Sequence, residues 1–166
     1  MDEPDVSVRS ISSCGVKTRM VMSAIGIFVG LSVFIVFTLQ YKNLNVGLWG
    51  LLSGLAAGIA FGVTVAYHKR AWDSNPRRLK GFMLLGCIIQ LGAICAFVAY
   101  LVLAISQNQA LTAYGKGYYL TSVWCAMTWK WGFGLLMYSR SFFYSFASAE
   151  GILNKDRLSS KAYSGN

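Results

Sequence analysis

The chain has 166 residues, of which 55% are hydrophobic and 13% are charged, and its formal net charge is +9. The apolar residues stand in long blocks, a pattern typical of membrane helices and not of a soluble domain whose helices have one polar face. The lysines and arginines lie in short segments beside these blocks, which argues against a nucleic-acid-binding domain with a separate basic surface.

Four apolar blocks follow one another along the chain, at residues 20–40, 46–67, 82–106 and 118–138. Each is near or above the ~20 residues that a helix needs to cross a bilayer. We therefore predict an all-α, four-transmembrane-helix membrane protein. It has a cytosolic N-terminal segment at 1–19, a transmembrane domain at 20–138 that contacts the lipid bilayer, and a cytosolic tail at 139–166.

The basic residues of the loops predict the orientation of these helices. They gather before the first helix, between the second and third, and after the fourth, whereas the other two loops hold only Lys42 and Lys116. Because cytosolic loops are enriched in lysine and arginine, we expect both termini in the cytosol. The same bias, together with anionic cytosolic lipids, accounts for the positive net charge without any specific ligand.

Glycines recur at every fourth position in the first two blocks. Fewer than six residues separate these blocks, so the two helices must form an antiparallel hairpin. Glycine at this spacing lets helix backbones approach closely, and we expect the glycine faces of the two helices to meet. A homo-oligomer formed through the same stripe is the alternative. The residues are Gly26, Gly30, Gly50, Gly54, Gly58 and Gly62.

The fourth block holds a lysine, Lys130, between Trp129 and Trp131. Charge is costly in a bilayer, and an ionisable residue there is a candidate functional residue. Every carboxylate of the chain lies outside the apolar blocks, so we expect Lys130 inside the bundle without an acidic partner, beside the small residues Ala126 and Gly134. An anionic ligand is one partner for it, and backbone carbonyls or water are the alternative.

The remaining motifs of the chain do not indicate an enzyme. Its four cysteines lack the spacing of metal ligands, and no nucleophile, base and acid are arranged as in a known hydrolase motif. No nucleotide-binding motif is present either, so facilitated movement of a ligand down its gradient is the simplest transport mechanism.

Several stretches of the last two blocks and their loops form a specific pattern, namely Leu79-Lys-Gly81, Ala96-Phe97, Leu101-Val-Leu-Ala-Ile105, Gln109-Ala-Leu-Thr112, Tyr118-Tyr-Leu-Thr-Ser-Val-Trp124 and Lys130-Trp131. Together they resemble the haem-responsive-gene family of four-helix haem transporters. The resemblance implies a haem importer that moves haem, as its substrate, from the outside or from a vesicle lumen into the cytosol. A cytosolic haem acceptor is then an expected partner.

Haem needs cations for its propionates, aromatic surface for its macrocycle and an axial ligand for its iron. We expect Lys130 and Arg140 to bind propionates. The resemblance places the iron-liganding position of the family's second helix, which is often a histidine, at Thr64, and this is a departure from the family pattern. Tyr67 and His68 follow about one turn later as candidate ligands. The aromatic candidates along the fourth helix and its tail are Trp129, Trp131, Tyr118, Tyr119, Phe142, Phe143 and Tyr144.

The sequence departs from the family pattern in two further places. Relatives carry a histidine in the lumenal loop, where this chain has Asn108, so haem capture there either depends on Tyr114, Lys116, Tyr118 or Tyr119 or is weak. The aromatic and basic tail motif corresponds to Arg140-Ser-Phe-Phe-Tyr144, in which the only basic residue is Arg140. This segment serves as a haem-release site or as an interfacial anchor.

Two other classes of protein fit parts of the pattern. A tetraspan membrane scaffold that transports nothing explains the glycine stripes and the aromatic residues. A carrier or channel for another organic anion gives Lys130 the role of a selectivity residue. The tail lacks a standard acidic dileucine sorting signal, which favours the plasma membrane over endosomes or lysosomes as the location.

Overall fold

The computed structural model describes residues 13–69, 78–110 and 117–164, with the side chains of Ser13, 147–150 and 152–164 left undescribed. Within these residues the chain is all-helical, with four helices and no strand. The helices are α1 (Ser13–Leu39), α2 (Leu44–His68), α3 (Arg78–Ser106) and α4 (Tyr118–Ser164). The predicted all-α fold is thus confirmed.

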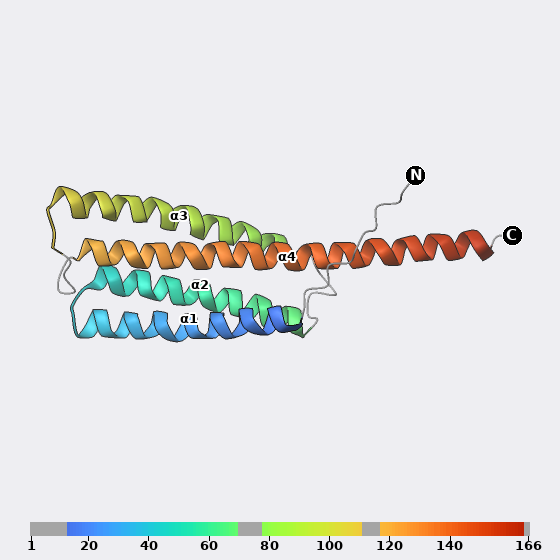
Figure 1. The fold of residues 1–166 in the computed structure, drawn as a ribbon, viewed down its shortest axis with the longest axis horizontal. Coiled ribbons are helices and arrows are strands. Elements are labelled where there is room, and N and C mark those ends of the chain that lie inside the picture. The colour runs from blue at the N-terminus through green and yellow to red at the C-terminus, as the bar shows by residue number, and fades with distance from the viewer. Residues whose placement is uncertain (1–12, 70–77, 111–116, 165–166) are drawn as a thin grey trace.

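The four helices lie side by side in the spatial order α3, α4, α2, α1 (Figure 1). The middle helix pair is α2 and α4, which pack on each other, while α1 packs mainly on α2 and α3 packs on α4. As a result α1 and α3 occupy opposite edges of the molecule, and α4 has neighbours on two sides only. This arrangement leaves part of the surface of α4 exposed along its length.

The helices share one end that is rich in basic residues. At this end α1 begins, α2 ends, α3 begins, and α4 continues outward beyond the other three (Figure 1). We call it the basic end, because the described lysines and arginines other than Lys42 and Lys130 lie in these parts of the helices. Those whose side chains are described are Lys17, Arg19, Lys69, Arg78, Lys80 and Arg140, and Lys155, Arg157 and Lys161 follow in the part of α4 that continues outward.

α4 is much longer than the predicted span of 118–138. It runs for 47 residues without a break, through the position at which we placed the start of the tail. At ~1.5 Å per residue its length is about 70 Å, more than twice the ~30 Å hydrocarbon layer of a bilayer. The C-terminal half of α4 therefore projects beyond the layer that the other helices span.

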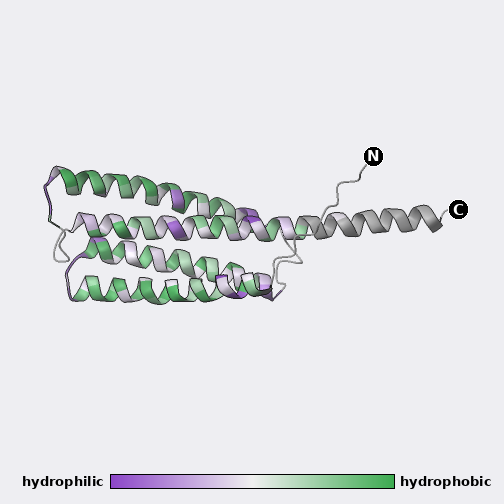
Figure 2. Ribbon diagram, in the orientation of Figure 1, coloured by the Kyte–Doolittle hydropathy of each residue, from purple (hydrophilic) through white to green (hydrophobic). Residues whose placement is uncertain are grey.

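Three of the described helices are long and apolar enough to cross a membrane by length and composition, namely α1 (as Cys14–Leu39), α2 and α3. α4 is more polar in its first half, as its paler and purple ribbon shows in Figure 2. Two of its buried hydroxyl groups are satisfied within the fold, since Thr121 donates to the Gly117 carbonyl and Thr128 to the Trp124 and Trp49 carbonyls. The chain is a multi-pass membrane protein, and a fourth span in α4 stays a prediction.

The first two helices form the predicted antiparallel hairpin, joined by residues 40–43. Their closest approach is between glycines, because a Cβ atom added to Gly30 would lie 2.6 Å from the backbone nitrogen of Gly54 and 2.8 Å from the carbonyl oxygen of Gly50. The predicted meeting of glycine faces is confirmed here. It does not extend to Gly62, which has open space, or to Gly26, which contacts Trp131 of α4.

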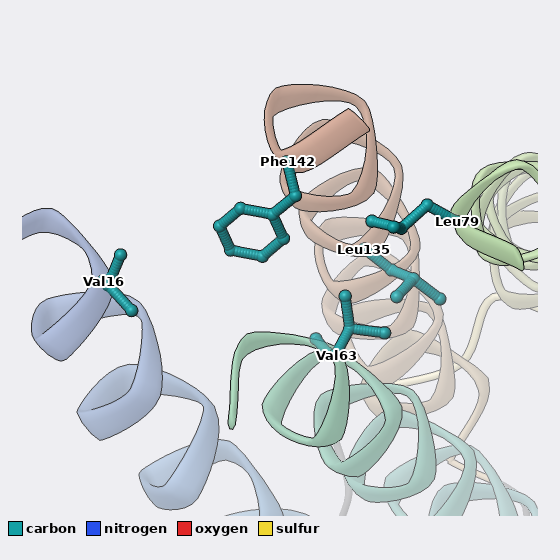
Figure 3. Packing of buried hydrophobic residues seen from close by; sticks show 6 residues of the cluster. Val16, Val63, Leu79, Leu135 and Phe142 are labelled. Carbon is teal, nitrogen blue, oxygen red and sulfur yellow. The ribbon is translucent and has the colours of Figure 1, made fainter. Parts of the chain in front are cut away.

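A hydrophobic core joins all four helices at the basic end. Figure 3 shows side chains from each helix turned toward a common centre, with Phe142 of α4 between α1 and α2. The core residues are Val16, Ala60, Val63, Leu79, Leu135 and Phe142. This core packs α4 against α1, α2 and α3 at the basic end. It therefore fixes the position of the aromatic side chains that surround it.

Candidate functional site

The predicted site residues lie at three levels along the helices. Tyr118 and Tyr119 begin α4 at the end opposite the basic end, and Lys130 with its two tryptophans lies about three turns later. The tail residues, together with the end of α2, lie at the basic end. Lys130 and Phe142 are twelve residues apart, which is about 18 Å along a helix. A single small ligand cannot touch both of these levels in one position.

Lys130 does not lie inside the bundle, and this prediction was wrong. Its side chain is exposed on the surface of α4, with Nζ 5.5 Å from the centroid of the Trp131 ring. The reason is the packing of the two residues that follow it. The backbone of Gly132 packs on the backbone of α3, and Trp131 packs against Gly26 of α1. Lys130 precedes these inward-facing residues and is therefore turned outward.

Lys130 belongs to a continuous exposed stripe on α4, which we call the outer stripe. Apart from Trp129, its members recur at intervals of three or four residues, the spacing of one helix face, and Trp129 lies four residues before Phe133. Two of them are cations and three are aromatic, and Trp129 stacks on Phe133 with ring centroids 6.2 Å apart. The outer stripe consists of Val123, Met127, Trp129, Lys130, Phe133, Met137, Arg140 and Tyr144.

The two tryptophans beside Lys130 have different environments. Trp129 is exposed and belongs to the outer stripe, whereas Trp131 is only 8% exposed. Trp131 packs with Ala56 and Ala57 of α2 in a second core cluster. Trp129 is consequently available to an external ligand, and Trp131 serves to hold α4 against α1 and α2.

Aromatic side chains at the basic end form a second group, which we call the aromatic cluster. It consists of Tyr67, Tyr138, Phe142, Phe143 and Phe146, packed around the hydrophobic core. Tyr67 stacks on Phe142 with ring centroids 4.0 Å apart and an interplanar angle of 13°, and meets Phe146 edge-on. Its hydroxyl lies 3.4 Å from the Ser145 hydroxyl, within hydrogen-bonding distance.

The three iron-ligand candidates of α2 differ in access. Thr64 is fully buried and donates its hydroxyl to the Ala60 carbonyl at 2.8 Å, so its oxygen is turned into its own helix. Tyr67 is half-buried, and its ring stacks on Phe142. His68 is exposed at the last residue of α2. The two residues named as candidate ligands thus remain reachable, and Thr64 does not.

The predicted tail residues divide between the two groups. Phe142 is fully buried and Phe143 is half-buried in the aromatic cluster, whereas Arg140 and Tyr144 are exposed in the outer stripe. The guanidinium carbon of Arg140 lies 5.6 Å from the centroid of the Tyr144 ring, a cation–π distance. Neighbouring residues of this motif therefore face opposite sides of α4.

Two cations at the aromatic cluster were not among the predicted site residues. Arg19 of α1 lies over the rings of Tyr138 and Phe142, with its guanidinium carbon 4.8 Å and 5.7 Å from their centroids. The ammonium of Lys80 on α3 lies 5.2 Å from the Phe143 ring centroid. In the sequence Arg19 indicates only the orientation of the first helix, and Lys80 belongs to the Leu79-Lys-Gly81 stretch without any sign that it lies near α4.

The far end of the molecule carries a smaller aromatic group. Tyr118 is half-buried, and its ring centroid lies 5.9 Å from that of Tyr100 on α3. The Tyr100 ring in turn meets the Trp49 ring of α2 edge-on. Tyr119 is half-buried as well. Asn108 is exposed in a left-handed backbone conformation, which asparagine tolerates better than most residues. Tyr114 and Lys116 lie outside the described residues.

Residues 79–131 match the family model described as "Haem-transporter, endosomal/lysosomal, haem-responsive gene". The matched segment covers α3 apart from its first residue, the connection to α4, and α4 as far as Trp131. Trp129, Lys130, Tyr118 and Tyr119 are inside it, whereas the aromatic cluster and all of α1 and α2 are outside. No solved structure matches this chain.

Proposed function

Because the match over residues 79–131 supports membership of the haem-responsive-gene family, we propose that this chain transports haem across a membrane. The family is one of transporters and not of enzymes. The match is the observation that carries the proposal. The multi-pass helical fold agrees with it, and haem is the substrate and not a resident cofactor.

Haem iron, in this proposal, is bound at the basic end by His68 or Tyr67. His68 is the more accessible, since its imidazole is exposed at the end of α2. Tyr67 offers a phenol oxygen beside Ser145, and tyrosinate is a known haem ligand. The aromatic cluster next to both residues gives the macrocycle an apolar surface that polar loop residues would not provide.

The outer stripe supplies a second position for haem, at the level of Lys130. Lys130 and Arg140 are both exposed there and are separated by Phe133 and Met137. A cation facing lipid is costly, and an anionic group bound to it lowers that cost. When haem binds at this position, one propionate contacts Lys130 and the macrocycle packs against Trp129 and Phe133. Transport then follows the surface of α4 rather than a path through a closed bundle.

Direction, coupling and compartment complete the proposal. The basic end faces the cytosol by the positive-inside bias, so haem moves toward the basic end and is taken up there by a cytosolic acceptor. Movement is facilitated and follows the haem gradient. The description of the family names endosomal and lysosomal membranes, which favours these compartments over the plasma membrane that the sequence suggested.

Binding is tested by titrating haemin into the purified, detergent-solubilised protein and following the Soret band. The proposal expects saturable binding that weakens in Lys130→Ala and in the Tyr67→Phe/His68→Ala double variant. A titration of the wild-type protein without a saturable spectral change contradicts it. If the fold is intact, such a result supports the alternative of a tetraspan membrane scaffold that transports nothing.

Transport is tested in lipid vesicles that contain the protein and enclose a haem-free globin as acceptor. External haemin should reach the globin faster than in protein-free vesicles and in vesicles with Lys130→Ala. Passage of small organic anions without haem delivery supports the anion-carrier alternative. Accumulation of haem above equilibrium in vesicles without acceptor contradicts facilitated transport.

A further inference from the structure

Arg19 occupies an unusual position at the junction of α1 and α4. Its guanidinium carbon lies over two aromatic rings, those of Tyr138 and Phe142, and Phe142 is also the ring on which Tyr67 stacks. A guanidinium that lies over a ring keeps its N–H donors in its own plane, free for an acceptor. Arg19 thus shares an aromatic ring with the candidate iron ligand of α2.

The donors of Arg19 are incompletely used within the described residues. Its Nη1 atom is buried and has no hydrogen-bond partner there. No ion pair of Arg19 is found in this part of the chain either, and all six carboxylates belong to segments whose side chains are not described. A buried donor without an acceptor is destabilising, and buried cationic groups are normally paired.

A second polar group without a partner belongs to the same turn of α4. Ser139 follows Tyr138, is 0% exposed, and its hydroxyl has no hydrogen-bond partner in the described part of the chain. Other helix hydroxyls of this protein donate to the carbonyl four residues earlier, as Ser23 and Thr121 do. Ser139 lacks this bond, so its hydroxyl remains able to donate to another acceptor.

We propose that Arg19 and Ser139 form a carboxylate-binding site at the basic end, which takes a propionate of haem while Tyr67 or His68 binds the iron. This inference rests on the proposed function, and it assigns the propionate at this level to α1 instead of to Arg140. A carboxylate accepts a charge-assisted hydrogen bond from the guanidinium and another from the hydroxyl. It satisfies both buried donors at once, which a phenyl ring cannot do.

The experiment compares two pairs of porphyrins that differ only in their carboxylates. Haemin and haemin dimethyl ester are titrated into the full-length detergent-solubilised protein, followed by metal-free protoporphyrin and its dimethyl ester. The wild-type protein should prefer each free acid to its ester. Arg19→Gln and Ser139→Ala should each weaken binding of the free acids about tenfold, as expected for loss of a charge-assisted hydrogen bond, and leave binding of the esters unchanged.

Lys17→Gln is the matched control, because Lys17 is exposed on the same end of α1 and its loss removes the same charge. It should keep the preference for the free acid. Arg19→Gln could fail to fold, and Ser139→Ala is the second variant for that reason, since it removes only a buried hydroxyl that has no hydrogen-bond partner among the described residues. Retention of the wild-type preference in both variants, or its equal loss in Lys17→Gln, overturns the carboxylate site.

The porphyrin pairs also separate this inference from the proposed function. If wild-type protein binds haemin saturably but shows no preference for free acids over esters, the carboxylate site is wrong and haem binding stands. If it binds no porphyrin, both are wrong. The metal-free pair tests the carboxylate site without iron ligation, so an error in the assignment of Tyr67 or His68 does not affect it.

Discussion

Tyr67 of α2 and Phe142 of α4 stack face to face, with ring centroids 4.0 Å apart. This contact brings the end of the second helix, where an iron ligand is expected, onto the helix that carries the tail motif. The two residues are 75 positions apart in the chain. Their stacking links the two predicted parts of the site, and it gives Tyr67 a structural role that must be separated from any role as an iron ligand.

Tyr67→Phe and Tyr67→Leu separate these two roles. Phenylalanine keeps the stacked ring and loses the phenol oxygen, whereas leucine loses both. If Tyr67 binds iron, loss of the phenol oxygen in Tyr67→Phe is sufficient to change the visible charge-transfer bands of bound ferric haem. Tyr67→Leu should additionally lower the free energy of unfolding by about 1 kcal/mol, which is the stabilisation that an aromatic pair contributes. Thermal unfolding of the protein in detergent measures this loss. A wild-type spectrum in Tyr67→Phe removes Tyr67 from the list of ligands.

His68→Ala should change haem binding without changing stability. The side chain is exposed, and surface substitutions usually alter the free energy of unfolding by less than about 0.5 kcal/mol. If His68 is the axial ligand, the Soret maximum of the haem complex shifts in this variant and exogenous imidazole restores it. Unchanged spectra in both His68→Ala and Tyr67→Phe would show that the iron is bound elsewhere.

Lys130→Ala should reduce haem delivery about tenfold in the vesicle assay, because one charge-assisted hydrogen bond to a propionate is lost. The fold should remain intact, since the side chain is exposed and α4 packs through other residues. Lys130→Arg keeps the charge and should retain most of the activity. A Lys130→Ala protein that fails to fold, or that transports at the wild-type rate, contradicts the role given to the outer stripe.

Gly30→Ala should destabilise the helix hairpin, because the added methyl group meets the backbone of Gly54 and neither backbone can give way easily. We expect a loss of about 2 kcal/mol, typical of overpacking, in a thermal unfolding experiment. Gly62→Ala is the control with the same change in a neighbouring helix, where a Cβ atom has no neighbour within 4 Å. Equal stability of the two variants would show that the close approach of α1 and α2 is not required.

Some parts of the fold were predictable because they depend on local sequence. The lengths of the apolar blocks gave the number of helices, and the very short first connection required an antiparallel hairpin. The regular glycine spacing predicted the contact of α1 with α2 near Gly30 and Gly54. The sequence does not predict the helical continuation of α4 beyond residue 138, because the polar tail indicates only where the membrane span ends and not where the helix ends.

The site was predicted less well than the fold. Aromatic and basic residues were identified by type, and most of them lie in the aromatic cluster or the outer stripe. Their directions were not identified, as Lys130 shows by facing outward and Thr64 by facing inward. Arg19 was missed because its partners Tyr138 and Phe142 are more than a hundred residues away in the chain.

Block length and composition are sufficient to identify a helical membrane protein with basic residues gathered at one end. The inward face of each helix, in contrast, depends on how the helices pack in the folded bundle. A helix that is apolar on all sides carries little signal for its inward face, since lipid and protein interior are equally apolar. Packing of small residues on neighbouring backbones, such as Gly132 on α3, turned Trp131 inward and Lys130 outward and so placed the candidate haem-binding residues.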